Sequence, residues 1–180
     1  FFQQLYNTVD TIIVGQAVGT SALAAVGSTG NLTSLIVNFY VGLSTGASVV
    51  IAQYYGAQNN KKIHQAVHTS YSLAIVSGIL MMLFGLFFSY QCLDAIGTPH
   101  DILNDATLYM QLYFLCMIPG AIYNIGAGIL RAVGDSKRPL YYLIVCSIVN
   151  VVFDYIFVVI FHQGIAGAAI ATVIAQFVCA

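Results

Sequence analysis

The chain has 180 residues, of which 59% are hydrophobic and only 6% are charged. Soluble domains carry about 25% charged residues, so this composition excludes an ordinary soluble protein and indicates one that lies in a lipid bilayer. The formal net charge of −1 offers no basic surface to nucleic acid, which excludes that class of partner.

Long apolar segments, taken in chain order, predict the membrane-spanning elements. A helix needs about 20 mostly apolar residues to cross a bilayer. The segments lack the alternation of barrel strands, so we expect an all-α, polytopic membrane helix bundle that forms one unit over residues 1–180. We expect four complete helices and a partial one at each end, as in a chain truncated at both ends: residues 1–16, 31–54, 65–93, 104–130, 139–161 and 165–180.

Two segments have a predicted local conformation of their own. Residues 15–30 are rich in Gly and other small residues, and we expect them to form an outer loop before the second helix. Pro119 lies in the middle of the predicted helix 104–130. Because its ring cannot continue the helical hydrogen-bond ladder, it predicts a kink there, and we assign it as a hinge.

All the basic residues fall in two of the predicted connections. Lys61 and Lys62 lie in one, and Arg131, Lys137 and Arg138 lie in the other. Two predicted helices separate these connections, so both lie on the same side of the membrane. By the positive-inside rule, that side is predicted to be cytoplasmic.

Two acids lie inside predicted helices. At 1.5 Å per residue, Asp10 and Asp154 lie roughly 8 and 12 Å below the predicted outer surface, and Thr172 lies roughly 12 Å below it. Asn150, four residues before Asp154, lies on the same helix face. An acid in a membrane helix usually faces a cavity or a partner and marks an ion or proton pathway; the alternative is a purely structural hydrogen-bond partner. The matched depths favour the pathway.

Several longer stretches resemble the multidrug and toxic compound extrusion (MATE) family of transporters. They are "LYNTVDTIIVGQAVGTSALAAVG", "GLSTGASVVIAQYYGA", "GILRAVGDSKRPLYYL", "NVVFDYIF" and "GIAGAAIATVIA". The similarity runs along the whole chain in the family's order. The chain resembles the first of the family's two six-helix halves, the N-terminal lobe of a twelve-helix transporter, without the start of its first helix and the end of its sixth.

The resemblance also implies functional positions. In the branch of the family that has a cation site in the N-terminal lobe, polar residues on the first, fourth, fifth and sixth helices form a network. The matching positions here are Tyr6, Asp10, Tyr109, Asn124, Asn150, Asp154 and Thr172. If Asp10 and Asp154 share one apolar cavity, the state in which both carboxylates are ionised is unfavourable. We therefore expect either a proton, or Na⁺ bound by the oxygens of Asp10, Asn150, Asp154 and Thr172, since hard cations prefer oxygen ligands.

The resemblance implies a multi-pass antiporter of the plasma membrane. It would export drugs or other organic, often cationic compounds in exchange for Na⁺ or H⁺, together with the missing C-terminal lobe of the same chain and surrounded by membrane lipid. A related flippase for lipids or lipid-linked oligosaccharides is the alternative, but it favours a more basic cavity, and no Lys or Arg lies within a predicted span. No Ser/His pair, metal-binding Asp pair or HExxH motif is present, so we expect neither an enzyme nor a cofactor.

Overall fold

The computed structural model describes residues 20–180, with side chains from Ala24 onward. Within that part all regular structure is helical, which confirms the predicted all-α class. The elements are α2 (Thr20–Gly56), α3 (Asn60–Ala95), α4 (His100–Leu115), α5 (Met117–Ala132), α6 (Lys137–Asp154), the π-helix η1 (Tyr155–Ile160) and α7 (Gly164–Cys179). The partial helix predicted over residues 1–16 lies outside the described residues.

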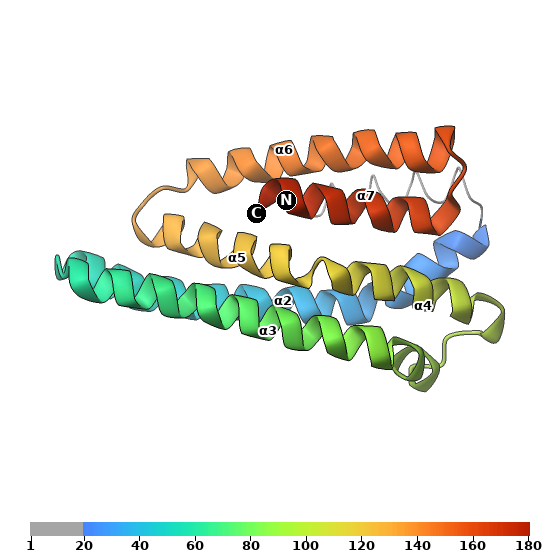
Figure 1. Ribbon diagram of the computed structural model, residues 1–180, viewed down its shortest axis with the longest axis horizontal. Helices are drawn as coiled ribbons and strands as arrows, with labels where there is room; N and C mark the ends of the chain where they lie inside the picture. Colours follow the sequence, from blue (N-terminus) through green and yellow to red (C-terminus); the bar gives the residue numbers. More distant parts are fainter. Residues whose placement is uncertain (1–19) are drawn as a thin grey trace.

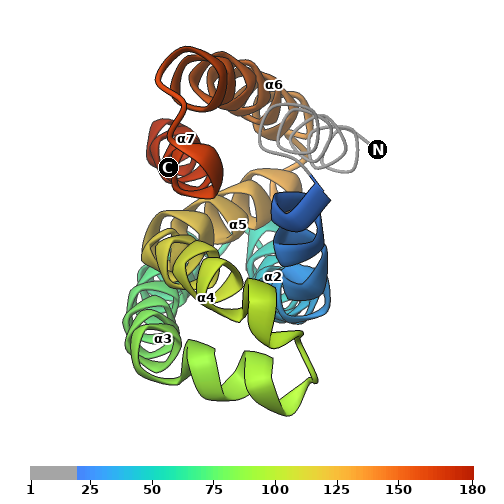
Figure 2. The same cartoon turned by 90° about the vertical axis from the view of Figure 1, so that its right-hand side faces the viewer.

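The α4–α5 pair lies at the centre of the bundle. The long hairpin of α2 and α3 packs along one side of it, and the hairpin of α6 and α7 lies on the other side, with α7 against both α4 and α5 (Figures 1 and 2). Among the described residues, three helices are long and apolar enough to cross a membrane, and the α4–α5 pair adds a fourth if it is one span. Those three are Ala24–Gly56, Asn60–Ala95 and Lys137–Ile160.

The connections divide between the two ends of the bundle. The α2–α3 and α5–α6 connections lie together at the left end in Figure 1, and the α3–α4 and α6–α7 connections lie at the right end. All the Lys and Arg residues flank the two connections at the left end. The Lys and Arg residues therefore all lie near one end of the bundle, as the sequence predicts. That this end faces the cytoplasm stays a prediction from the charge pattern.

The α2 helix begins earlier than predicted. The sequence predicts an outer loop over residues 15–30 and a helix over 31–54, whereas the chain is helical from Thr20 to Gly56. The predicted loop is therefore wrong for its described part. Small residues such as Gly27 and Gly30 do not end a helix in an apolar environment, because each backbone N–H must find its partner within the segment there.

The span predicted over residues 104–130 is broken. Its halves, α4 and α5, are bent by 49° at Cys116, three residues before Pro119. The N–H of Cys116 donates to the carbonyl of Tyr113 at 3.0 Å, a tighter turn than the α-helix, and Pro119 has no N–H to donate to Leu115. The kink lies where the proline predicts it. Its use as a hinge stays a prediction.

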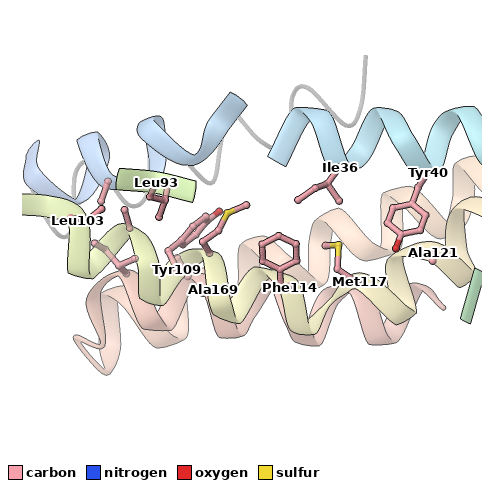
Figure 3. Close-up of a cluster of buried hydrophobic side chains, with 14 of the residues drawn as sticks. Ile36, Tyr40, Leu93, Leu103, Tyr109, Phe114, Met117, Ala121 and Ala169 are labelled. Atoms are coloured by element: carbon pink, nitrogen blue, oxygen red, sulfur yellow. The ribbon is translucent and has the colours of Figure 1, made fainter. Parts of the chain in front are cut away.

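Apolar side chains fill the space between the helices. Ile36 and Tyr40 of α2 point toward Phe114, Met117 and Ala121 of the α4–α5 pair (Figure 3). Many large apolar side chains point outward instead; on α3, the exposed fraction reaches 71% for one phenylalanine and 63% for one leucine. A surface with this much exposed apolar area fits an acyl-chain environment.

Candidate functional site

The centre of the candidate site lies on one face of α6. Asn150 and Asp154 are four residues apart, so they lie one helical turn from each other, and both are 0% exposed. This face packs against α7, which carries Thr172 at 3% exposed. The structure thus brings together three of the four residues that the sequence predicts as the cation-coupling group.

Hydrogen bonds join the two helices at this point. Asn150 Nδ2 donates to Thr172 Oγ1 at 3.4 Å, and Thr172 Oγ1 in turn donates to the carbonyl of Ala168, one turn earlier on α7, at 3.0 Å. Because the threonine proton is used within α7, the oxygen of Thr172 is left as an acceptor that faces α6. The hydroxyl therefore presents an oxygen rather than a proton to the site.

The side chains of Asn150, Asp154 and Thr172 offer oxygen atoms as possible ligands. Among the described residues, Asn150 Oδ1 is buried and accepts no hydrogen bond, which is costly unless another donor or a cation satisfies it. Carboxylate, amide and hydroxyl oxygens are the ligands that hard cations prefer. Within residues 20–180, no three His, Cys, Asp or Glu side chains converge as a transition metal would require. The residues present thus fit Na⁺ or a proton.

A π-helix begins directly after Asp154. The segment η1 has wider turns than an α-helix and ends at Ile160, and the N–H of Phe161 donates to the carbonyl of Ile156 at 2.9 Å. Sequence reasoning missed this element. Short π-helical turns inside α-helices are frequent at functional sites, which is consistent with the position of Asp154 at the junction.

The turn after η1 lets α7 pack closely on it. His162 and Gly164 have positive φ angles of 51° and 60°. A Cβ added to Gly167 would lie 3.1 Å from the backbone carbon of Phe157, a tight contact that would push α7 and η1 apart by a few tenths of an ångström, so the glycine favours their close approach. This contact holds the first turn of α7, and therefore the register of Thr172, against the segment that follows Asp154.

The two network residues predicted on the fourth span lie on α4 and α5, and their part in the network stays a prediction. Tyr109 of α4 is buried in the apolar core beside Ala169 of α7 (Figure 3). Asn124 of α5 donates from Nδ2 to the carbonyl of Gly120 at 2.8 Å, so its amide is bonded to its own helix. Tyr6 and Asp10 lie outside the described residues, and their roles stay predictions.

One close contact between α2 and α5 was also missed. Ser44, 1% exposed, donates from Oγ to the backbone carbonyl of Asn124 at 2.5 Å. Gly128, one turn later on α5, faces the same serine, and a Cβ there would overlap Ser44 Oγ. The sequence signal was present as small residues on both helices, but their partners could not be assigned without the fold.

Comparison with known proteins identifies the family. A model of the MatE family matches residues 1–156. The chain belongs to the MATE family. The resemblance found in the sequence is thereby confirmed, and the members of this family are transporters embedded in membranes.

Relatives and solved structures agree with this assignment. The chain is 31% identical over 176 residues to the "Probable multidrug resistance protein YoeA" of Bacillus subtilis, covering 96% of this chain and 38% of that protein. It is 25% identical over 182 residues to the "Probable multidrug resistance protein NorM" of Thermotoga maritima, covering 98% and 39%. A crystal structure of a MATE protein in the bent conformation matches with a TM-score of 0.94 and 29% identity, over 99% of this chain and 40% of that one.

The chain is much shorter than the MATE proteins that it matches. It spans about two-fifths of the length of the MATE proteins that it matches. The described bundle therefore corresponds to part of such a transporter, and the activity of a whole protein has to be proposed rather than read from this part.

Proposed function

We propose that the chain forms the N-terminal lobe of a cation-coupled antiporter that exports drugs or other organic, often cationic compounds across the plasma membrane. A second six-helix lobe of the same protein would complete the transport pathway. Membership of the MATE family and the names of the multidrug resistance relatives support export of this kind. The coupling ion would be Na⁺ or H⁺, bound in this lobe.

One observation carries the proposal. Asp154 is fully buried in a candidate membrane-spanning segment and lies one turn from Asn150, whose side chain donates to Thr172. Burying a carboxylate costs several kcal/mol, which protein partners, a cation or a proton must offset, and intramembrane acids usually mark an ion or proton pathway. Asn150 contributes a buried amide oxygen with no bond to a described donor, and this oxygen fits a cation ligand better than a purely structural amide.

The same residues suggest how an ion gradient would act on the lobe. Binding of one cation or proton changes the charge at Asp154 by one unit. That change can shift the lobe between two conformations only if the ion binds them with different affinity. Asn150 and Thr172 would set this affinity, because their oxygens lie on two separate helices. Ion binding would therefore depend on the distance between these helices. Asp10, if it shares the site as predicted, would make the two acids respond as one unit.

Substitution of the acid tests the proposal directly. In the full-length transporter reconstituted in vesicles, Asp154→Asn is expected to abolish efflux driven by a Na⁺ or H⁺ gradient while leaving substrate binding measurable. Asp10→Asn is expected to give the same result, and the double variant is expected to be little worse than either single one. Asp135→Asn is the matched control, since this carboxylate lies in the α5–α6 connection.

Two further results complete the test. Thr172→Ser keeps the hydroxyl and is expected to retain coupled efflux, whereas Thr172→Val removes the oxygen and is expected to raise the ion concentration needed for half-maximal efflux. Normal ion-coupled efflux by Asp154→Asn would show that this acid is structural and would overturn the proposed coupling.

A further inference from the structure

A groove of about 650 Å³ lies between α2, α3 and α5, away from the α6–α7 site. Its lining residues on these two helices fall within 42–54 of α2 and 62–73 of α3, the parts nearer the α2–α3 connection, which lies at the left end in Figure 1. Its volume is within the range of about 300–1,000 Å³ that is typical of small-molecule sites. The cation-coupling residues do not line it, so the proposed antiport leaves it unexplained.

The wall that α2 contributes is smooth and apolar. Gly42, Gly46, Ala47 and Val50 form it, and a Cβ added to Gly42 or Gly46 would meet no described atom within 4 Å. Two glycines four residues apart often mark a face where another helix packs closely, but here their face borders open space. The trough along them is lined mainly by carbon, which suits a hydrocarbon chain.

The wall that α3 contributes is polar toward one end. Lys62, Gln65 and Thr69 follow one another at helical spacing, and the wall continues with Leu73 toward the middle of the helix. Lys62 Nζ lies 5.4 Å from the centre of the Tyr54 ring, so the aromatic face helps to hold the ammonium group at the mouth. The groove is thus cationic at the end of the bundle and apolar toward its centre.

We propose that this groove binds an anionic phospholipid of the cytoplasmic leaflet. The phosphate would lie at Lys62, with Gln65 and Thr69 beside the ester groups, and one acyl chain would lie along Gly42 and Gly46. Basic pockets between transmembrane helices on the cytoplasmic side recognise anionic headgroups in this way. The charge of the mouth matches this occupant, because Lys62 is the one charged side chain among the described residues that line the groove.

Other occupants fit less well. An organic cation, the cargo expected of the proposed transporter, would be repelled by Lys62. A helix of the second lobe would cover the glycine face but would leave the ammonium group of Lys62 against apolar surface without an anion, which is costly. A phospholipid satisfies both ends of the groove at once.

Photolabelling in lipid nanodiscs tests the headgroup. The full-length protein is incubated with phosphatidylglycerol or phosphatidylcholine that carries the same photoreactive acyl chain, and the adducts are mapped by mass spectrometry. Phosphatidylglycerol is expected to label residues 42–50 and 65–73 more strongly. Lys62→Gln is expected to lower this preference about fivefold, the effect of about 1 kcal/mol that one lysine contributes near an anionic headgroup. Lys61→Gln, the same change at the neighbouring residue outside the groove, is expected to leave the preference unchanged.

A second pair of variants tests the acyl chain. Gly46→Leu fills the trough and is expected to abolish labelling of residues 42–50 by both lipids, whereas Ala52→Leu, on the same helix but outside the groove, is expected to preserve it. Equal labelling by the two headgroups, or the same loss with Lys61→Gln, would overturn the proposal. Absence of lipid adducts in the unmodified protein would also overturn it and would indicate that another part of the protein covers the groove. The Lys62 arm does not depend on whether Gly46→Leu folds.

Discussion

The contact between Ser44 and Gly128 gives a prediction whose size follows from the geometry. A Cβ added by Gly128→Ala would overlap Ser44 Oγ and would lie 2.9 Å from the backbone oxygen of Ser44. The two helices must then separate. Forcing a methyl group into such a contact costs about 1–3 kcal/mol. Separation also breaks the bond from Ser44 Oγ to the carbonyl of Asn124.

The remaining contributions are smaller and partly cancel. An interhelical hydrogen bond in a membrane protein is worth about 0.6 kcal/mol on average. Replacing Gly by Ala in a helix interior returns about 0.5–1 kcal/mol. We therefore expect Gly128→Ala to lower the free energy of unfolding by about 1–3 kcal/mol, and Ser44→Ala alone to lower it by about 0.6 kcal/mol.

The double variant decides whether this contact is the cause. Without the hydroxyl, the new methyl group still meets the backbone carbonyl group of Ser44 but no longer its Oγ, so Gly128→Ala with Ser44→Ala is expected to be destabilised by less than the sum of the single variants. Unfolding of the full-length protein in mixed detergent micelles, followed by circular dichroism, measures these differences. Gly42→Ala is the control, since its Cβ would meet no described atom within 4 Å. Equal stability of the Gly128 and Gly42 variants, or purely additive effects, would refute the reasoning.

Three further predictions follow from other parts of the fold. In a protein without native cysteines, a cysteine at Asn60 should react with a membrane-impermeant thiol reagent only from the cytoplasmic side, and one at the exposed His100 only from outside; reversed labelling would contradict the orientation. Pro119→Ala should slow transport more than it lowers expression if the 49° bend works as a hinge, and an unchanged transport rate would show a static bend. Asp135→Ala should lower stability by about 1 kcal/mol, because its Oδ1 accepts the N–H groups of the first turn of α6. Ser136→Ala should have little effect on the melting temperature, as its side chain makes no cap bond.

The sequence was most informative about the fold where length and apolar content decide the structure. The segment predicted over 65–93 lies inside α3, and the one over 139–161 corresponds to α6 and η1, because a bilayer admits few alternatives to a helix. Boundaries were less predictable. Glycine and serine in residues 20–30 have the composition of a loop in water, and only the surroundings of α2 make them helical.

In the candidate site, too, local geometry could be predicted from the sequence, whereas contacts that depend on how helices pack could not. Spacing and depth in the sequence predict the grouping of Asn150, Asp154 and Thr172, because helical geometry converts sequence distance into position. The bond between Ser44 and the Asn124 carbonyl could not be anticipated, since it joins residues 80 positions apart whose facing directions depend on how the helices cross. The π-helix has no comparable local signature in its composition.

The π-helix after Asp154 also keeps the buried residues of this span on one face of the helix. Asn150, Asp154 and Val158 are all buried, at intervals of four residues. Four residues of an α-helix turn by about 400°, so each step would overshoot the buried face by about 40°, and Val158 would begin to rotate outward. A wider turn brings it back into line. Asp154 therefore lies where the helix changes its winding, and the loss of a single residue between Tyr155 and Ile160 would be felt as a rotation of everything beyond it, including the close contact between Phe157 and Gly167.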